Sequence, residues 1–472
     1  MPFLGYNLTL ELRRELEGTR AEIACRGTDN YGESIKSWSD TCQKEAGAVV
    51  YVTTTEEVSI VIAFARKHHI EFVVKGGGHS TGGESASHGG IVISLRKMRK
   101  VLADPASETV CVQGGCTWDE VNKATAPYNL AVVGATASQT GVGGSTLGGG
   151  YGWLTGRHGL IIDSLVGVRV VLADGSVFEA SEDAHQDLFW AIRGAGQAFG
   201  VVTEFTFRAH HIPDQVFGGL LYFSVDKLRK VVEFANWFDE QQDENSGFFF
   251  GFSVPSLVDE PVITAVLFYN GTKDKAHEFF APLLSLDSVT NTTDMMSYTE
   301  LSQVTNIEPI PEGRKCFGGT HIKFPLDETL VKELWNVFSQ ITEDYPLMGN
   351  SVLAFELLPY GKVMSVPVDA TACANRGRFY NVGLLLCWRE AGHDAVMDQY
   401  RQFIISKIEH SQKGDTGEGV AAYANYAGHD FGAKYLFGDN LPRLQELKRL
   451  YDPHNVFRKW HNLLSSTDTH PA

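Results

Sequence analysis

The chain has 472 residues, of which 43% are hydrophobic, so it is long enough to bury a large core and to form two or three domains. Its 40 basic and 57 acidic residues give a net charge of −17, which argues against a nucleic-acid partner. Its sequence contains no run near the roughly 18 apolar residues of a transmembrane helix, so no membrane partner is expected.

Short apolar runs and helix signals alternate in the first part of the chain. Residues 1–45 are polar and compatible with helical structure, and we expect this N-terminal segment to pack on the rest of the protein. Residues 48–52 predict a strand. The capping box Thr54-x-x-Glu57 then begins a helix with Val58, Val61, Ile62 and Ala65 on one face. The β-branched run at 70–74 predicts a second strand.

A loop rich in glycine, KGGGHSTG at 75–82, follows that strand. Glycine lets the backbone turn sharply and approach a ligand, and successive N–H groups form a nest for a phosphate. A glycine-rich turn with a surface histidine is the plainer interpretation. The sequence Gly78-x-Ser80-x-Gly82 also fits the nucleophile elbow of serine hydrolases. That motif needs a helix after the serine, whereas more glycines lead here to a predicted strand at 91–95.

A second glycine-dense block, GVGGSTLGGGYG at 141–152, follows a predicted strand at 109–113 and a helix begun by Thr117-x-x-Glu120. The block is not expected to form a regular helix or strand, because each glycine weakens either by about 0.5–1 kcal/mol relative to alanine. A flexible linker would be polar, whereas Val142, Leu147 and Tyr151 interrupt this block. We therefore predict an ordered loop that lies against a ligand.

The remaining elements predict an α+β fold. Residues 166–173 and 176–180 form a hairpin around Asp174-Gly175, and a helix at 187–193 and a strand at 200–207 complete the first module. The following region predicts an antiparallel sheet with helices on one face, from strands at 248–252, 262–269, 320–324, 352–359 and 380–388 and helices at 225–241 and 275–286. A strand at 423–426 and a helix at 441–451 close the chain.

The seven cysteines are scattered and never spaced C-x-x-C, which indicates mostly free thiols of a reducing compartment, with a Cys25–Cys42 bridge as the alternative. No H-E-x-x-H occurs, and the histidine doublets lack carboxylate or thiol neighbours at ligand spacing, so no metal site is expected. The start of the chain lacks the regions of an export signal. We expect a cytoplasmic protein, with secretion left open if a signal peptide was removed.

The glycine loops fit neither G-x-G-x-x-G between a strand and a helix nor G-x-x-x-x-G-K-[ST], which excludes a Rossmann fold and a P-loop. A third glycine-to-strand junction, GAGQAFGVV, precedes the strand at 200–207. Three such loops indicate an extended ligand across strand ends, such as FAD.

The motifs KGGGHSTGG, QGGCTWDEV, GVGGSTLGGGYGWLTGRHGL, DSLVGVRVVLADGSV, GAGQAFGVVTEFTF and YDPHNVF occur in this order. In this order they resemble the berberine-bridge-enzyme-like FAD-linked oxidases, which have the FAD-binding fold of vanillyl-alcohol oxidase (PCMH type). The resemblance implies an FAD-binding domain at 1–210, an inserted substrate domain at 211–415 and a segment at 416–472 that returns to the FAD-binding domain.

The resemblance also implies a flavin bonded through its 8α-methyl group to His79. It places Lys75, Gly76, Gly77, Gly78 and Ser80 at the pyrophosphate, with lysine where many relatives have arginine. The other flavin neighbours that it implies are Thr140, Gly143, Gly144, Gly149, Gly150, Gly152, Val201, Asn425 and Asn455. Ala137 stands where relatives with two links have a cysteine, so a single link is expected. Thr140 corresponds to a position facing the approach of O2.

Flavin oxidation of a C–H bond needs a base for the proton of the adjacent group. The resemblance suggests Tyr423, with Tyr426 as the substitute, although alternation along a strand would point Tyr426 to the opposite face. Packing is the plainer interpretation of both rings. Glu356, on a predicted strand, is a further candidate unless it is a surface carboxylate, and His321 is a weaker one.

The leading interpretation is an oxidase that uses O2 and oxidises an alcohol or another small molecule of secondary metabolism. An oxidative cyclase of natural-product biosynthesis and a flavoprotein guiding a cyclisation without net redox remain open, with a serine hydrolase last. Aromatic residues suggest a flat, ring-bearing substrate, although they also stack on sugars; they are Phe248, Phe249, Phe250, Tyr269, Phe355 and Tyr360. The sequence leaves the oligomeric state undetermined.

Overall fold

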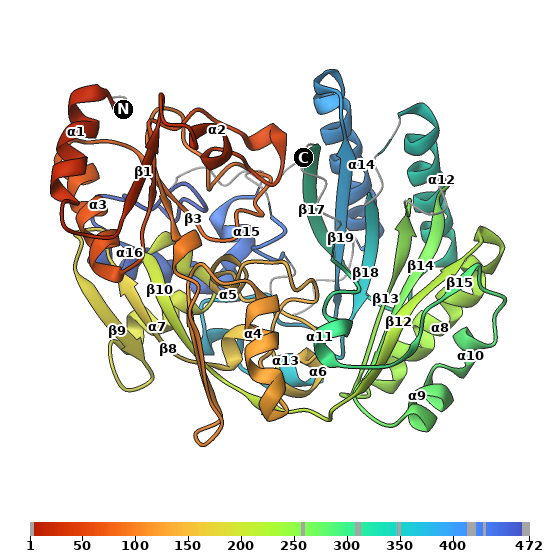
Figure 1. The fold of residues 1–472 in the computed structure, drawn as a ribbon. Helices are drawn as coiled ribbons and strands as arrows, with labels where there is room; N and C mark the ends of the chain where they lie inside the picture. Colours follow the sequence, from red (N-terminus) through yellow and green to blue (C-terminus); the bar gives the residue numbers. More distant parts are fainter. Residues whose placement is uncertain are drawn as a thin grey trace.

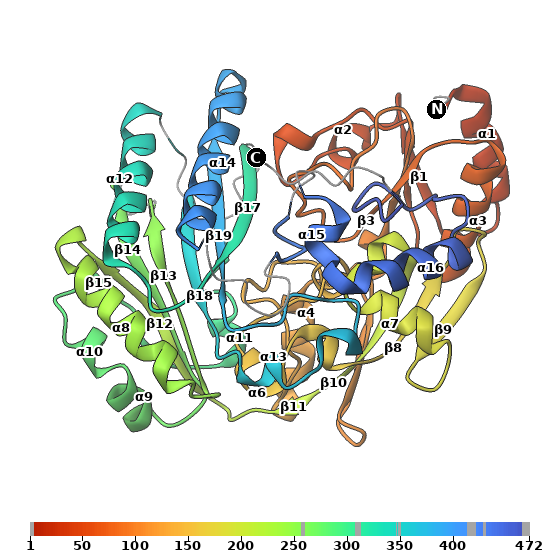
Figure 2. The ribbon, with the colours of Figure 1, turned by 180° about the vertical axis from the view of Figure 1, so that it is seen from behind.

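The computed structural model describes residues 4–464 except 256–259, 307–312, 346, 348–350, 413–421 and 428–430. The chain forms two parts that lie side by side (Figure 1, Figure 2). One part holds the N-terminal half together with the C-terminal helices α15 (Ala433–Phe437) and α16 (Leu441–Tyr451), and the other is a large sheet with helices. This arrangement confirms the predicted α+β class, while the proposed domain boundaries stay a prediction.

The first sheet has the strand order β1-β2-β4-β3. Strands β2 (Ala48–Tyr51) and β3 (Phe72–Lys75) both run parallel to β4 (Ile91–Ser94), and α3 (Thr55–Lys67) connects β2 to β3 as predicted. The side chain of Thr54 accepts the N–H of Glu57 at the start of α3. Sequence analysis missed β1 (Glu22–Cys25), which pairs antiparallel with β2, because its four residues lie in a polar segment.

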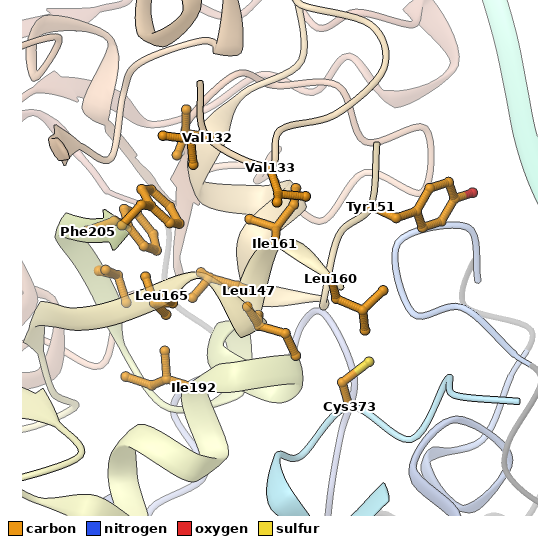
Figure 3. Close-up of a cluster of buried hydrophobic side chains, with 14 of the residues drawn as sticks. Val132, Val133, Leu147, Tyr151, Leu160, Ile161, Leu165, Ile192, Phe205 and Cys373 are labelled. Carbon is orange, nitrogen blue, oxygen red and sulfur yellow. The ribbon is translucent and has the colours of Figure 1, made fainter. Parts of the chain in front are cut away.

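The second sheet is antiparallel, with the order β5-β6-β10-β8-β9. The predicted hairpin turns at Gly175, where φ is +85°. Figure 3 shows the apolar cluster beside this sheet, which includes Leu147, Ile161, Ile192 and Phe205. The bounds are β5 (Val101–Asp104), β6 (Thr109–Gln113), β8 (Leu165–Val171), β9 (Val177–Ser181), β10 (Val201–Arg208), α4 (Trp118–Thr125), α6 (Thr155–His158) and α7 (Gln186–Ala195).

One expectation for the glycine-dense block was wrong. Its first half forms a short helix, α5 (Val142–Leu147), which contains Gly143 and Gly144. The helix is only six residues long, and its buried Val142, Thr146 and Leu147 anchor it in the core. Tertiary packing thus outweighs the low helix propensity of two glycines, a cost of about 1 kcal/mol each.

The third sheet has the order β15-β12-β14-β13-β18-β19-β17, with β16 also paired to β12. The predicted strands at 262–269 and 380–388 are β14 (Val262–Tyr269) and β19 (Tyr380–Trp388). The other strands are β12 (Val216–Phe223), β13 (Ser246–Ser253), β15 (Thr290–Asn291), β16 (Asp294–Met296), β17 (Arg314–Ile322) and β18 (Val352–Leu357).

Helices cover one face of this sheet, as predicted (Figure 1). Side-chain alternation sends Phe248 and Phe252 of β13 into the core under the helices, whereas Phe249 points to the opposite face. These helices are α8 (Leu228–Gln241), α9 (Lys273–Phe279), α10 (Ala281–Leu284), α12 (Glu328–Asp344) and α14 (Asp394–Ser411). The short elements elsewhere are α1 (Tyr6–Glu15), α2 (Tyr31–Ser34), β7 (Leu130–Ala131), β11 (His210–His211), α11 (Tyr298–Leu301) and α13 (Gly361–Met364).

The predicted tail strand at 423–426 is a turn. The N–H groups of Tyr426 and Ala427 both donate to the carbonyl oxygen of Tyr423, at 2.9 and 3.0 Å. A turn removes the alternation of a strand, so the rings of Tyr423 and Tyr426 lie together, with centroids 4.8 Å apart. The expectation that Tyr426 points to the opposite face was therefore wrong.

All seven cysteines lie in the described part of the chain and are free, so the alternative Cys25–Cys42 bridge is not formed. The thiol of Cys42 donates instead to the carbonyl oxygen of Thr81 at 2.6 Å. None of the helices within the described ranges is long and apolar enough to cross a membrane.

A buried ion pair ties the C-terminal segment to the first part. Lys448 and Asp452 are both fully buried, and Lys448 Nζ lies 2.6 Å from Asp452 Oδ2. Lys448 also donates to the carbonyl oxygens of Ala198 and Phe457, and Asp452 accepts the N–H groups of Val456 and Phe457. The pair therefore holds residues 456–457 near Ala198, which lies just before β10.

Replacing Lys448 by methionine is expected to lower the free energy of unfolding by about 3–5 kcal/mol, because the Asp452 carboxylate stays buried without its cation. Urea unfolding followed by circular dichroism measures this loss. The matched control is Lys123→Met, which breaks a Lys–Asp pair at the same helical spacing, with Lys123 60% exposed, and should cost less than about 1 kcal/mol. Equal small losses in both variants would contradict the importance of the buried pair.

Candidate functional site

A cavity of about 580 Å³ lies between the glycine loops and the open face of the third sheet. This volume is within the usual range of small-molecule and cofactor sites. Residues from β3 and its loop, from α5, from the start of β10, from β12, β13, β14 and β18, and from the segment 456–460 all line it. Both parts of the fold and the C-terminal segment therefore build one site.

The glycine loops meet at backbone contacts that leave no room for side chains. A Cβ on Gly77 would lie 2.8 Å from Gly141 Cα, and a Cβ on Gly141 would lie 2.7 Å from Gly77 N. Gly76 and Gly143 both face the carbonyl oxygen of Gly114. Of the predicted cofactor residues, Gly76, Gly77, Gly78, Gly143 and Gly144 line the cavity. This cradle of bare backbone suits a ligand that needs close N–H contacts.

Three glycines in the second half of the glycine-dense block, Gly149, Gly150 and Gly152, do not line the cavity, although Tyr151 between them does. A Cβ on Gly149 would lie 2.8 Å from Cys373 Sγ, and one on Gly150 or Gly152 would collide with Ile161 or the carbonyl of Gly134. These three glycines allow close packing and the positive φ values of Gly149 and Gly150. Their contact with the cofactor therefore stays a prediction.

His79 lines the cavity and stacks on Trp38, with ring centroids 4.9 Å apart and an interplanar angle of 4°. Lys315, whose ammonium donates to the carbonyl oxygen of Trp38 at 2.8 Å, lies behind this pair. Burial, with a smaller contribution from the Lys315 charge, lowers the pKa of His79 to about 4. The imidazole is therefore neutral at neutral pH, and one of its ring nitrogens keeps a lone pair.

Of the two polar side chains predicted to contact the phosphate, one lines the cavity and the other does not. Ser80 lines the cavity and donates to Glu84, whereas Lys75 lies outside the lining and its ammonium donates to the carbonyl oxygen of Lys36. Among the described lining residues the cations are Arg458 and Lys459 from the C-terminal segment, and Lys459 forms an ion pair with Glu71 at 2.8 Å. Sequence analysis missed both, because contact between that segment and the first loop exists only in the folded chain.

The remaining predicted cofactor residues also differ in position. Thr140, Val201 and Asn425 line the cavity, as does Ala137. The amide nitrogen of Asn425 donates to the carbonyl oxygen of Ser145 at 2.9 Å and to the hydroxyl of Tyr423 at 2.8 Å. Asn455 lies outside the lining, and its amide nitrogen donates to Asn462 Oδ1.

A carboxylate and phenols form the polar cluster of the cavity. Alternation along β18 buries Phe355 and Leu357 under the helices and turns Glu356 to the cavity. Tyr426 Oη lies 3.0 Å from both carboxylate oxygens of Glu356, and the hydroxyl of Tyr151 donates to the same group. The ring of Tyr423 packs 4.8 Å from the ring of Tyr151. The structure thus brings together the three candidate acid–base residues.

Tyr151 is a member of this cluster that sequence analysis noted only as an apolar residue. In Figure 3 Tyr151 lies at the edge of the apolar cluster, and its hydroxyl points away from the other labelled side chains. The signal was the lone phenol in GGGYG, directly after Gly149 and Gly150. Its partner Glu356 is distant in sequence, so the hydrogen bond was not predictable.

Burial raises the pKa of the carboxylate and of the three phenols in this polar cluster, but leaves them in different pH ranges. Burial raises the pKa of Glu356 to about 7, although hydrogen bonds from Tyr151 and Tyr426 lower it in part. Burial, together with the charge of Glu356, raises the pKa of Tyr151 and Tyr426 well above 10, and burial likewise raises that of Tyr423. Near neutral pH the phenols are donors, and Glu356 is the group in this cluster that exchanges a proton.

Other residues singled out in the sequence lie elsewhere. His321 is outside the lining and contacts Phe379, with ring centroids 5.6 Å apart. Phe249 and Phe250 line the cavity, although Phe250 also belongs, with Phe248, Tyr269 and Phe355, to the core under the helices. The hydroxyl of Tyr360 donates to Asp239. No group of three or more His, Cys, Asp or Glu within the described residues is suited to holding a metal ion.

Comparison with known proteins agrees with this geometry. A family model for an FAD binding domain matches residues 46–181, and one for berberine and berberine-like proteins matches residues 422–463. FAD-linked oxidoreductase pgmH of Aspergillus terreus is 36% identical over 471 residues, which covers 95% of this chain and 94% of the relative. The chain belongs to the berberine-bridge-enzyme-like family of FAD-linked oxidoreductases. The expected resemblance is confirmed.

Solved structures share the fold over nearly the whole chain. Physcomitrella patens BBE-like 1 superposes with a TM-score of 0.83 at 21% identity and covers 97% of this chain and 99% of its own. 6-Hydroxy-D-nicotine oxidase from Arthrobacter nicotinovorans has a TM-score of 0.82 at 23% identity, with coverage of 94% and 98%. These two likenesses show the fold. The family models and the 36% identical relative show that the protein is an FAD-linked oxidoreductase, and the cavity with its glycine cradle lies where the FAD binding domain meets the third sheet.

Proposed function

We propose that the protein oxidises a small hydroxylated organic substrate with FAD attached through His79, and that O2 is the final electron acceptor. The observation that carries this proposal is that Glu356, with its two phenol donors, lines the same cavity as His79 and the glycine cradle. The substrate would lose one hydride and one proton and become a carbonyl compound. O2 would take up both electrons with two protons and become hydrogen peroxide.

The residues of the cradle fit FAD. The bare backbone at Gly76–Gly78 and Gly143–Gly144 would hold the pyrophosphate and ribityl portions, and Arg458 and Lys459 would supply positive charge. FAD, when bound, supplies the two-electron acceptor. Neutral His79 keeps a nitrogen lone pair for attachment, and Ala137, which lines the cavity, has no nucleophile for a second link. The single link therefore rests on His79.

Glu356 would accept the proton of the substrate hydroxyl. Its carboxylate is held by Tyr151 and Tyr426, which fix its orientation, and its pKa of about 7 is matched to neutral pH. Tyr423 packs on both phenols and receives the amide hydrogen bond of Asn425. This assignment makes Tyr423 a supporting residue rather than the base suggested by the sequence, because burial raises its pKa.

The rate of flavin reduction is expected to fall about tenfold per pH unit below about pH 7 and to level off above it. Glu356 is a base only when ionised, and its raised pKa places half-ionisation near pH 7. Anaerobic stopped-flow measurements across pH 5–9 check this profile. A profile that stays flat down to about pH 5, where an unperturbed glutamate is still mostly ionised, would contradict the raised pKa of Glu356.

Peroxide and O2 measurements during turnover test the overall reaction. One peroxide per oxidised substrate is the expected result. A cyclised product formed with one peroxide would identify the oxidative cyclase, whereas turnover without O2 consumption would identify a cyclisation without net redox.

A further inference from the structure

The open face of the third sheet forms a floor whose layout follows from strand register. Glu356 of β18 stands level with Phe249 of β13, and Phe249 stands level with Val266 of β14. One residue pair further along, Ala354 is level with Gly251, and Gly251 is level with Thr264. Because side chains alternate along each strand, these residues share the cavity face, and all of them line the cavity.

The middle of this floor is apolar and has small side chains. Gly251 and Ala354 lie between the two ends, and Val266 and Val352 flank them, all in the cavity lining. None of these side chains offers a hydrogen bond. A sugar lying here would bury hydroxyl groups without partners, at a cost that an apolar ring does not have. The small side chains also leave room for a thin ring system beside Phe249.

A second polar group stands at the far end of the floor from Glu356. The hydroxyls of Ser253 and Thr264 lie 2.5 Å apart, and Tyr222 is level with Thr264 on the neighbouring strand β12. These three side chains line the cavity, whereas Ile263 and Ala265 on either side of Thr264 face the helices. One hydrogen bond within the Ser–Thr pair leaves it an O–H donor and acceptor sites for a ligand.

The distance between the two ends follows from sheet geometry. Thr264 is two strands and two residues away from Glu356, which corresponds to roughly 12 Å at about 4.8 Å per strand and 3.3 Å per residue. Within the described lining, the third sheet contributes one charged side chain, Glu356. An anionic substrate would therefore meet a like charge without a compensating cation on this face.

We propose that the substrate is an uncharged, flat and mainly apolar molecule with two hydrogen-bonding groups about 12 Å apart, one oxidised at Glu356 and the other bound at Ser253, Thr264 and Tyr222. This inference rests on the proposed function for the reacting end. It adds the far end, the length and the charge of the substrate. Hydroxylated biaryl or fused polycyclic compounds have this form.

A matched pair of probes tests the far end on the holoenzyme. The first probe, 4-hydroxymethyl-4′-hydroxybiphenyl, has an oxidisable alcohol at one end and a phenol at the other, and the second, 4-(hydroxymethyl)biphenyl, lacks the phenol. The dissociation constant is measured by calorimetry, and KM and kcat by anaerobic flavin reduction and turnover. We expect the first probe to bind about tenfold more tightly, as one or two added hydrogen bonds allow.

One double variant and one control variant, each measured with both probes, test whether the phenol of the first probe binds at the Ser–Thr pair. In Thr264→Val combined with Ser253→Ala the preference for the first probe should disappear, chiefly through KM and the dissociation constant. The control is Thr290→Val, a threonine of the same sheet outside the cavity lining, which should keep the preference. A preference that persists in the double variant, or tighter binding of cellobiose or of 4′-(hydroxymethyl)biphenyl-4-carboxylate, would overturn the inference.

Binding and flavin reduction separate the proposed oxidation from the proposed binding site at the far end. If the probes bind with the expected difference but none reduces the flavin, the proposed oxidation fails while the layout of the site stands. If the flavin is reduced by both probes with equal KM and equal dissociation constants, the oxidation stands and the far end is not a binding site.

Discussion

His79→Ala is expected to abolish covalent attachment of the flavin completely. The neutral imidazole is the nucleophile that the cavity offers beside the glycine cradle, and Ala137 gives no second site of attachment. Flavin fluorescence on a denaturing gel, or in the pellet after acid precipitation, measures the attachment. The wild-type band should be fluorescent and the variant band dark. The loss of the electron-withdrawing link should also lower the flavin potential and the rate of its reduction.

His321→Ala is the matched control. Burial lowers the pKa of His321 to about 4, as for His79, but His321 lies outside the cavity lining. This variant should keep the covalent flavin. Flavin that appears entirely in the supernatant of the wild-type protein would contradict the covalent link, and fluorescence retained by His79→Ala would show attachment at another residue.

Glu356→Gln is expected to slow anaerobic flavin reduction about 10²–10⁴-fold. The amide keeps the size of the side chain and can still accept the hydrogen bonds of Tyr151 and Tyr426, but it does not take up a proton at neutral pH. Stopped-flow absorbance of the flavin measures the rate. Reoxidation by O2 should hardly change, because that half-reaction does not use the carboxylate.

The tyrosine variants distinguish the possible bases. In Tyr426→Phe the carboxylate loses a donor that lowers its pKa, so the acid limb of the pH profile should move to higher pH. In Tyr423→Phe the ring stays and the reduction rate should change little. Wild-type rates in Glu356→Gln, with a large loss in Tyr423→Phe, would reassign the base to Tyr423.

Local sequence was sufficient where a short segment fixes its own structure. The capping box at Thr117 and Glu120 and the turn at Asp174 and Gly175 depend on neighbours within a few residues, and both formed as predicted. The turn at Tyr423–Tyr426, whose hydrogen bonds are local, was missed because its aromatic residues favour a strand. The short strand β1 was missed because its partner β2 is distant in sequence. The helix α5 formed against its glycine content because its buried residues anchor it in the core.

The sequence by itself determined the family, the glycine loops and the candidates His79, Glu356, Tyr423 and Tyr426. The ordered motifs carry the family resemblance, and the roles of His79 and the two tyrosines follow from that resemblance. Only the tertiary structure decided which of them share a cavity. Strand alternation turned Glu356 inward, and a turn brought Tyr426 beside it. Burial then set the proton affinities, since a pKa depends on surroundings drawn from the whole chain rather than on the residue.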